Sequence, residues 1–417
     1  MFRVLRRRDF GLLFAGQLVS QIGDYALLVA LPVWTYQLTG SAAATGGVFI
    51  AATLPQLVLS PVAGVFVDRW PRRATMIGAD LLRAALVLGL FAVRSPDQLW
   101  LIYALTCLQS SVSRFFFPAR TAVLPLLVPR EQLMQANAAV SFSDALARLG
   151  GPALGGLFMA AWGVRAAIAL DALSYVASAA LIAMLHLAEA RGASVRPGGW
   201  GQAIHAFSRD LAAGVRTVAA RSALRMLFGT AALFSLAQGI ISVLIVVLVT
   251  AVWGGGPAEV GWLTSAQGLG ALAGGMAVGV VAARVGPRTL LTAGSAGTGC
   301  LLLLMVNQPS TVVALVLYAL VGVLAVGLQV GVGTLLQLET TNEFRGRVSS
   351  LLSTVGAAAA LGSMGVTSAV AAAVGTVAML DIAGLLFIAA GLVTFGLGKV
   401  ALPRPERLKS RLGPVRH

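Results

Sequence analysis

Eight charged side chains lie inside long apolar segments of this 417-residue chain. They are Asp24, Asp80, Arg83, Arg114, Asp144, Arg148, Asp171 and Asp381. A charge in hydrocarbon is costly, so each marks either a functional site or an ion pair. Asp24 stands in a polar cluster with Gln21, which predicts a helix face turned toward a cavity rather than toward lipid. Desolvation disfavours an ionised carboxylate, so Asp24 is suited to bind and release a proton there.

The other charged residues offer a rival carrier and several pairings. Asp144 is the alternative proton carrier. Arg114 and Arg148 are expected to modulate the competition between proton and substrate at Asp24. A structural role for Asp24, paired with a neighbouring helix, remains the competing interpretation. Asp144 and Arg148 are spaced i,i+4, and Asp80 and Arg83 are spaced i,i+3, so each couple can pair on one helix face. Asp171 and Asp381 are expected near the outer helix ends, capping helices or facing water.

No arrangement of residues suits an enzyme or a metal centre. The sequence lacks the glycine-rich loop that cradles nucleotide phosphates and lacks the His-Glu-x-x-His and Cys-x-x-Cys spacings. Both cysteines, Cys107 and Cys300, lie in apolar segments, which argues against a disulfide framework and thiolate ligands. We therefore expect no enzymatic activity, no metal and no cofactor.

Composition places these residues in a membrane protein. Hydrophobic residues make up 58% of the chain and charged residues 11%, which is too little polar surface for a soluble protein of this length. Apolar stretches of at least about 18 residues, long enough to span a bilayer, recur along the whole chain. The net charge of +15 does not indicate nucleic-acid binding, because the cations lie between apolar segments. We expect a lipid bilayer as partner and no nucleic acid.

The predicted fold is all-α, with twelve transmembrane helices in two pseudo-symmetric six-helix bundles. The expected units are the bundles 1–187 and 224–398, a cytoplasmic linker over 188–223 and a basic cytoplasmic tail over 399–417. Apolar residues from Ile204 to Val218 recur at helical spacing, which predicts an amphipathic helix on the inner membrane surface. A solvated flexible linker is the alternative.

The distribution of cations predicts the orientation. Assigning the loops alternately to two sides places 25 arginines and lysines on one side and only Arg94 and Arg165 on the other. Cytoplasmic loops carry the excess of basic residues, so both termini are expected in the cytoplasm. The expected location is the inner membrane of a bacterial cell, which the chain crosses several times. The fourth span is expected over about 98–117 and the fifth over about 140–161, with boundaries uncertain by several residues.

One loop repeats and carries a resemblance to a known family. Residues 64–73, after the second span, correspond to residues 279–288 after the eighth, and repeated halves are a transporter architecture. The pattern Gly-x-x-x-Asp-Arg-x-x-Arg-Arg resembles the signature loop of the major facilitator superfamily. Its defining positions are Gly64, Asp68, Arg69, Arg72 and Arg73. With the twelve-span plan, the resemblance covers essentially the whole chain.

The resemblance implies that this loop is a conformational latch. In the outward-open state we expect Asp68 to meet the N-terminal end of the eleventh span, where a carboxylate is favoured, and a nearby arginine such as Arg114 or Arg120. The three arginines of the loop are expected to anchor it to anionic headgroups or to a neighbouring helix.

A second motif lies in the fifth span. Gly151, Pro152, Gly155 and Gly156 resemble the Gly-Pro-x-x-Gly-Gly motif of antiporters in the same family. Small residues let helix backbones approach closely, and proline allows a bend. We expect this motif to pack against the eighth span of the other half. The small residues expected to meet it there are Gly268, Gly270, Gly274 and Gly275. A tightly packed, kinked helix without directional meaning is the alternative.

A third set of residues resembles one branch of the major facilitator superfamily. The blocks over 118–137, 209–216 and 345–348 are similar to the branch that contains macrolide-efflux proteins and enterobactin exporters. This resemblance implies a monomeric, proton-coupled exporter of a small amphipathic compound, such as a drug, a macrolide-like metabolite or a siderophore. An importer or facilitator on the same fold, and a lipid flippase or sensor, are the alternatives.

Overall fold

The computed structural model describes residues 2–67, 70–186, 209, 214–281, 284–308 and 310–396. Within these residues twelve helices have 18 residues or more, and no strand occurs. They are α2 (Arg8–Thr39), α3 (Ala42–Val67), α4 (Arg72–Gly89), α5 (Leu99–Leu127), α6 (Leu133–Trp162), α7 (Val164–Ala183), α9 (Ser222–Val247), α10 (Pro257–Val281), α11 (Pro287–Val306), α12 (Thr311–Glu339), α13 (Asn342–Val374) and α14 (Thr376–Gly396). A short helix, α1 (Phe2–Leu5), precedes them. The expected tail over 399–417 lies outside the described residues.

Ten of the twelve long helices have the length and composition needed to cross a membrane. The remaining two, α5 and α6, carry more polar side chains, including Gln109, Arg114, Asp144 and Arg148. Those four side chains line a cavity, so the lower hydropathy of α5 and α6 comes in part from residues that do not face lipid.

The boundaries predicted for the fourth and fifth spans are too short. Helix α5 continues through Pro118 to Leu127, and α6 begins at Leu133. A proline costs a transmembrane helix less than a soluble one, because neighbouring groups satisfy the freed backbone carbonyl. The extra turns extend both helices beyond their apolar segments. Of the predicted amphipathic helix over 204–218, only a part is described, and residues 214–220 are helical.

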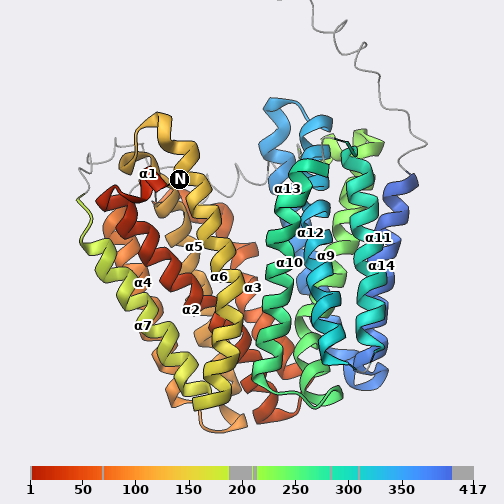
Figure 1. Ribbon diagram of the computed structural model, residues 1–417, viewed down its shortest axis with the longest axis horizontal. Coiled ribbons are helices and arrows are strands. Elements are labelled where there is room, and N and C mark those ends of the chain that lie inside the picture. The colour runs from red at the N-terminus through yellow and green to blue at the C-terminus, as the bar shows by residue number, and fades with distance from the viewer. Residues whose placement is uncertain are drawn as a thin grey trace, which may run out of the picture.

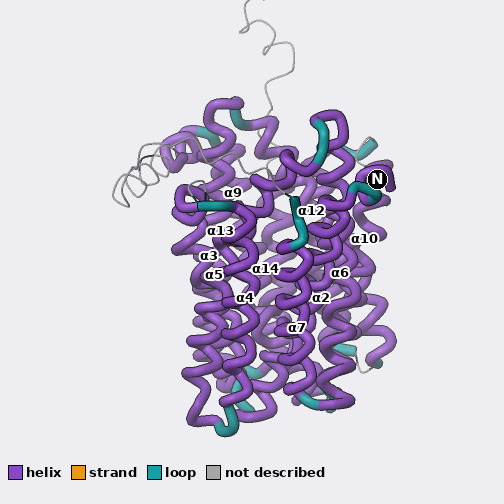
Figure 2. Tube along the Cα trace, turned by 90° about the vertical axis from the view of Figure 1, so that its left-hand side faces the viewer, coloured by secondary structure: helices purple, strands orange, loops and turns teal. Residues whose placement is uncertain are grey.

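The helices form two bundles with equivalent internal packing (Figure 1). In the N-terminal bundle α2 packs on α6 and α7, and α5 packs on α3 and α4. The same pattern recurs in the C-terminal bundle, where α9 packs on α13 and α14, and α12 packs on α10 and α11. Figure 2 shows the long helices running between the two ends of the molecule. The predicted fold class is confirmed.

The bundles meet along two helix pairs, α6 with α10 and α3 with α13. Exchanging the two halves converts one pair into the other, as a pseudo-two-fold relation requires.

Burial differs between the two ends of the molecule. At the end remote from the N-terminus, one apolar cluster joins both bundles and includes Val29 and Val33 of α2 with Val249 and Val260 from the C-terminal bundle. At the N-terminal end the apolar clusters are separate, one within residues 4–185 and one within residues 224–351. The molecule is therefore sealed at one end and parted at the other, and Figure 1 shows the bundles diverging toward the N-terminus.

Candidate functional site: a charged cavity in the N-terminal bundle

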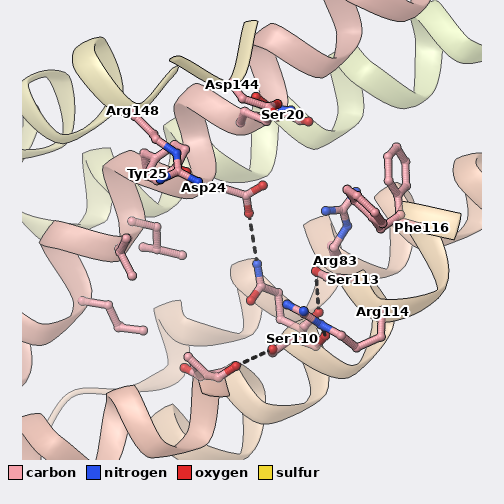
Figure 3. A pocket seen from close by; sticks show the side chains of 18 of the residues that line it. Ser20, Asp24, Tyr25, Arg83, Ser110, Ser113, Arg114, Phe116, Asp144 and Arg148 are labelled. Carbon is pink, nitrogen blue, oxygen red and sulfur yellow. Dashed lines mark hydrogen bonds between the residues drawn. The ribbon is translucent and has the colours of Figure 1, made fainter. Parts of the chain in front are cut away.

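All five residues predicted to form the substrate and proton pathway line one cavity. Its volume is about 720 Å³, within the range of small-molecule pockets. The five residues are Gln21, Asp24, Arg114, Asp144 and Arg148. Every residue that lines the cavity belongs to the N-terminal bundle, from α2, α3, α4, α5 or α6. Figure 3 shows the charged side chains converging on this space.

Asp24 is held by hydrogen bonds from two other helices. The hydroxyl of Tyr175 on α7 donates to Asp24 Oδ1, and Gln109 Nε2 on α5 lies 3.5 Å from the same oxygen. Gln109 also donates to the Tyr175 hydroxyl at 2.7 Å. Arg83 and Arg114 both act on Asp24 electrostatically. Neither Tyr175 nor Gln109 was predicted from the sequence. The polar run that begins at Gln109 was the available signal for one of them, whereas Tyr175 stands in an apolar segment without one.

Arg83 contacts both an acidic residue and the aromatic ring of Tyr175. Its guanidinium pairs with Asp80, as the i,i+3 spacing predicts, and both side chains are buried. The guanidinium also stacks between two aromatic rings, 4.3 Å from the ring centre of Tyr175 and 4.6 Å from that of Phe116. Arg83 therefore fixes the ring whose hydroxyl binds Asp24, in addition to forming the structural pair expected from sequence.

We expect Arg83→Leu to destabilise the folded protein by about 3–5 kcal/mol, because Asp80 would remain as a buried, unpaired charge. Thermal unfolding in detergent measures the loss. The double variant Asp80→Leu with Arg83→Leu removes both charges and should recover much of the stability. Equal stability of the single and double variants would show that the pair is not electrostatically coupled.

The predicted pair of Asp144 with Arg148 is wrong. Asp144 instead lies 3.9 Å from Arg120 of α5, which also donates to Gln17 Oε1 at 3.0 Å. Arg148 lies over the ring of Tyr25, with 5.9 Å between the guanidinium carbon and the ring centre. Because α5 and α2 both face α6 across the cavity, partners on other helices replace the neighbour one turn away.

Asp171 also departs from expectation. It lies two turns inside α7, fully buried, and neither carboxylate oxygen has a hydrogen-bond partner of normal geometry among the described residues. The side chain packs on the backbone of Gly23, where a Cβ atom would lie 2.6 Å from Asp171 Oδ1. Asp381 is half-buried in the second turn of α14 and accepts a hydrogen bond of 2.7 Å from Asn307.

The signature loop is only partly described. Gly64 lies in the last turn of α3, and the described residues resume after Asp68 and Arg69, which lie outside them. Arg72 donates to the Ala122 carbonyl of α5 at 3.2 Å. Arg73 donates to the carbonyls of Ile182, at 3.3 Å, and Ala183 at the end of α7. These two arginines therefore bind the start of α4 to two neighbouring helices.

The glycine motif faces two helices, whereas a single partner was predicted. A Cβ atom at Gly151 would collide with Tyr25, and one at Gly155 with the backbone of Ala26, so both glycines pack on α2 within their own bundle. Gly156 faces the other bundle, against the backbone of Pro257 and Gly261 on α10. Successive small residues on a helix point in different directions, so only part of the motif reaches α10.

The α10 side of this contact also differs from the prediction. Gly268 meets the backbone of Arg148 on α6, as expected, and Gly261 joins it. Gly270 and Gly274 pack instead on α12, and Gly275 has open space beside it. The Ser265 hydroxyl of α10 accepts a 2.9 Å hydrogen bond from the Ala153 backbone of α6. Backbone atoms of α6 and α10 therefore approach closely at Gly156, Gly261 and Gly268.

Two repeated bundles, a charged cavity in the membrane-spanning part and a contact built from small residues define a transporter of the major facilitator type. The model of the family described as transmembrane secretion effector matches residues 1–411. The chain belongs to this family, whose members are transporters and not enzymes.

Two curated proteins are similar to this chain in sequence. Macrolide efflux protein A of Streptococcus pyogenes is 33% identical over 180 residues, which cover 43% of this chain and 44% of the relative. BacE of Bacillus subtilis, named as a candidate bacilysin exporter, is 31% identical over 176 residues, covering 42% of this chain and 43% of the relative. The alignments therefore span less than half of each relative.

Solved structures share the fold at low sequence identity. A bacterial homologue of the iron transporter ferroportin, in an inward-facing state, superposes with a TM-score of 0.74 at 16% identity, covering 95% of this chain and 98% of that one. The nucleoside transporter NupG gives a TM-score of 0.73 at 10% identity, covering 94% and 100%. These likenesses concern the fold alone.

Proposed function

We propose that the protein exports a small amphipathic compound in exchange for protons, by alternating access. The observation that carries the proposal is Asp24, a carboxylate in the cavity wall that is held by the neutral donors Tyr175 and Gln109. Relatives named as a macrolide efflux protein and a candidate bacilysin exporter support the outward direction.

The proposed orientation places the parted end toward the cytoplasm of a bacterial cell. The strong bias of basic residues toward that side supports it, as does the N-terminus lying at the parted end (Figure 1). The linker over 188–223 and the tail over 399–417 then lie on the cytoplasmic surface of the inner membrane. In this state a solute enters from inside, and the protein works as a monomer.

Competition at one carboxylate provides the coupling. A proton neutralises Asp24, and a basic group of the solute would pair with its ionised form, so each displaces the other. Arg83 and Arg114 stay as fixed positive charges beside the site, which disfavours simultaneous binding of both. When a proton arriving from outside releases the solute, the proton gradient drives export.

The test is accumulation of macrolides and lipophilic dyes in a bacterial host that lacks its own efflux pumps. Expression of the protein should lower the accumulated amount, and an uncoupler should restore it. Raised accumulation would identify an importer or facilitator. An unchanged level for every compound, with altered lipid exposure on the outer leaflet, would favour the flippase.

The latch remains a proposal with its own prediction. We expect Asp68→Asn to cripple transport while folded protein stays in the membrane, because Asp68 is proposed to lock the halves at the N-terminal end of α13 in the outward-open state. Efflux and membrane abundance are measured together. Near-normal efflux by this variant would exclude the latch.

A further inference from the structure

Four arginines and only two aspartates provide the charged residues of the cavity wall. They are Arg83, Arg114, Arg120, Arg148, Asp24 and Asp144. Arg83 pairs with Asp80 behind the wall, and Arg120 pairs with Asp144. Within the described residues, no carboxylate lies at ion-pair distance from either of the other two arginines.

Of these two, Arg148 is the more available. Arg114 is half-buried, donates toward the Ser110 carbonyl at 3.4 Å and acts electrostatically on Asp24. Arg148 is exposed to the cavity and lies over the ring of Tyr25, a neutral side chain. A guanidinium in a membrane-spanning helix without an anionic partner is costly, which favours a solute that supplies the anion.

Arg148 also lies where the halves meet. A Cβ atom on Gly268 of α10 would lie 2.9 Å from its carbonyl oxygen, so this turn of α6 touches the other bundle directly. A solute group bound to Arg148 is therefore beside the contact that must change during transport. Figure 3 shows Arg148 and Tyr25 on one side of Asp24 and Arg114 on the other.

We infer that the exported compound is an amphipathic zwitterion, whose acidic group binds the Arg148 guanidinium while its basic group competes with the proton at Asp24. The second half of this inference rests on the proposed function, whereas the first half stands on the cavity alone. Apolar residues such as Leu28, Leu31 and Phe49 line the rest of the cavity and suit a hydrophobic body. A purely cationic solute would leave Arg148 unpaired and meet an excess of like charge.

Hydrophobic dipeptides test the inference. Esterification removes the negative charge and N-acetylation removes the positive charge, while the rest of the molecule stays the same. Binding of the free zwitterion, its methyl ester and its N-acetyl form is measured by calorimetry on the purified full chain, for a panel of side chains. We expect the zwitterion to bind about tenfold to a hundredfold more tightly than the ester, as a charge-assisted hydrogen bond implies.

Variants locate the preference. Arg148→Gln should remove most of the advantage of the zwitterion over the ester by weakening the zwitterion and not the cationic ester, and Arg148→Lys should retain part of the advantage. Arg165→Gln, at the sealed end and outside this cavity, is the matched control and should change neither affinity. Asp24→Asn should reduce the preference for the zwitterion over the N-acetyl form.

Three outcomes overturn the inference: esters binding as tightly as zwitterions, Arg148→Gln weakening both forms equally, or no zwitterion of the panel binding. The result is separable from the test of proton-coupled export. Loss of uncoupler-sensitive efflux together with an Arg148-dependent preference would reject the proposed coupling and leave the acid-binding role of Arg148 intact.

Discussion

Asp24→Asn is expected to abolish proton-driven efflux while leaving energy-independent exchange of solute across the membrane. Asparagine preserves the shape of the side chain and its contacts with Tyr175 and Gln109 but cannot exchange a proton. Proteoliposomes with and without an imposed pH gradient separate the two activities. The wild-type rate should rise with the gradient, and the variant rate should not respond to it.

Asp9→Asn provides the matched control on the same helix. Asp9 lies outside the cavity, where it accepts a hydrogen bond from the His186 backbone, so its loss should leave the response to the gradient unchanged. If Asp24→Asn instead transports with an unaltered pH profile, Asp24 is excluded as the carrier. Asp144→Asn then becomes the variant to examine, since Asp144 is the other carboxylate of the cavity wall.

Gly156→Leu is expected to reduce efflux to below about a tenth of the wild-type rate, because the proposed transport cycle requires α6 and α10 to come into backbone contact at the sealed end. A side chain at this position would collide with Pro257 and Gly261 of the opposite bundle. The three atoms nearest to an added Cβ all belong to the opposite bundle, so we expect the N-terminal bundle to fold. Efflux per molecule of membrane-inserted protein is the measurement.

Two further leucine substitutions make the result interpretable. Gly275→Leu places the same side chain on α10 in open space and should transport normally. Gly155→Leu collides with Ala26 of α2 inside one bundle, so its main effect should be a lower yield of folded protein. Normal efflux by Gly156→Leu would mean that the glycine contact is ordinary packing without a role in the cycle.

The sequence predicted the helices well because their physical cause is local. Apolar stretches must be long enough to cross a bilayer, and the loops between them carry a directional bias of charge. Pro118 shows the limit, since a proline that usually ends a soluble helix is tolerated in α5. The expense of a charge in hydrocarbon likewise singled out Asp24, Arg114, Asp144 and Arg148, which all line the cavity.

Partnerships between helices could not be predicted, because they depend on how each helix is rotated and which helix lies opposite. The spacing of Asp144 and Arg148 favoured a pair within α6, yet Arg120 on α5 is the partner of Asp144. Tyr175 contributes to the Asp24 site from an apolar stretch in which an aromatic residue carries no signal. The glycine motif failed in the same way, since sequence does not say which glycine faces which helix.

The contact between Gly156 and Gly261 bears on how fast the two bundles can separate. Helices held by interdigitating side chains must withdraw each side chain from its pocket before they part, and every withdrawal adds to the barrier. Here glycine backbone makes the closest approaches between α6 and α10, and the Ser265 hydroxyl accepts one hydrogen bond from the Ala153 backbone. Such a surface lets α6 and α10 slide and tilt with little repacking, so turnover should be limited by the loading of Asp24 rather than by friction between the helices.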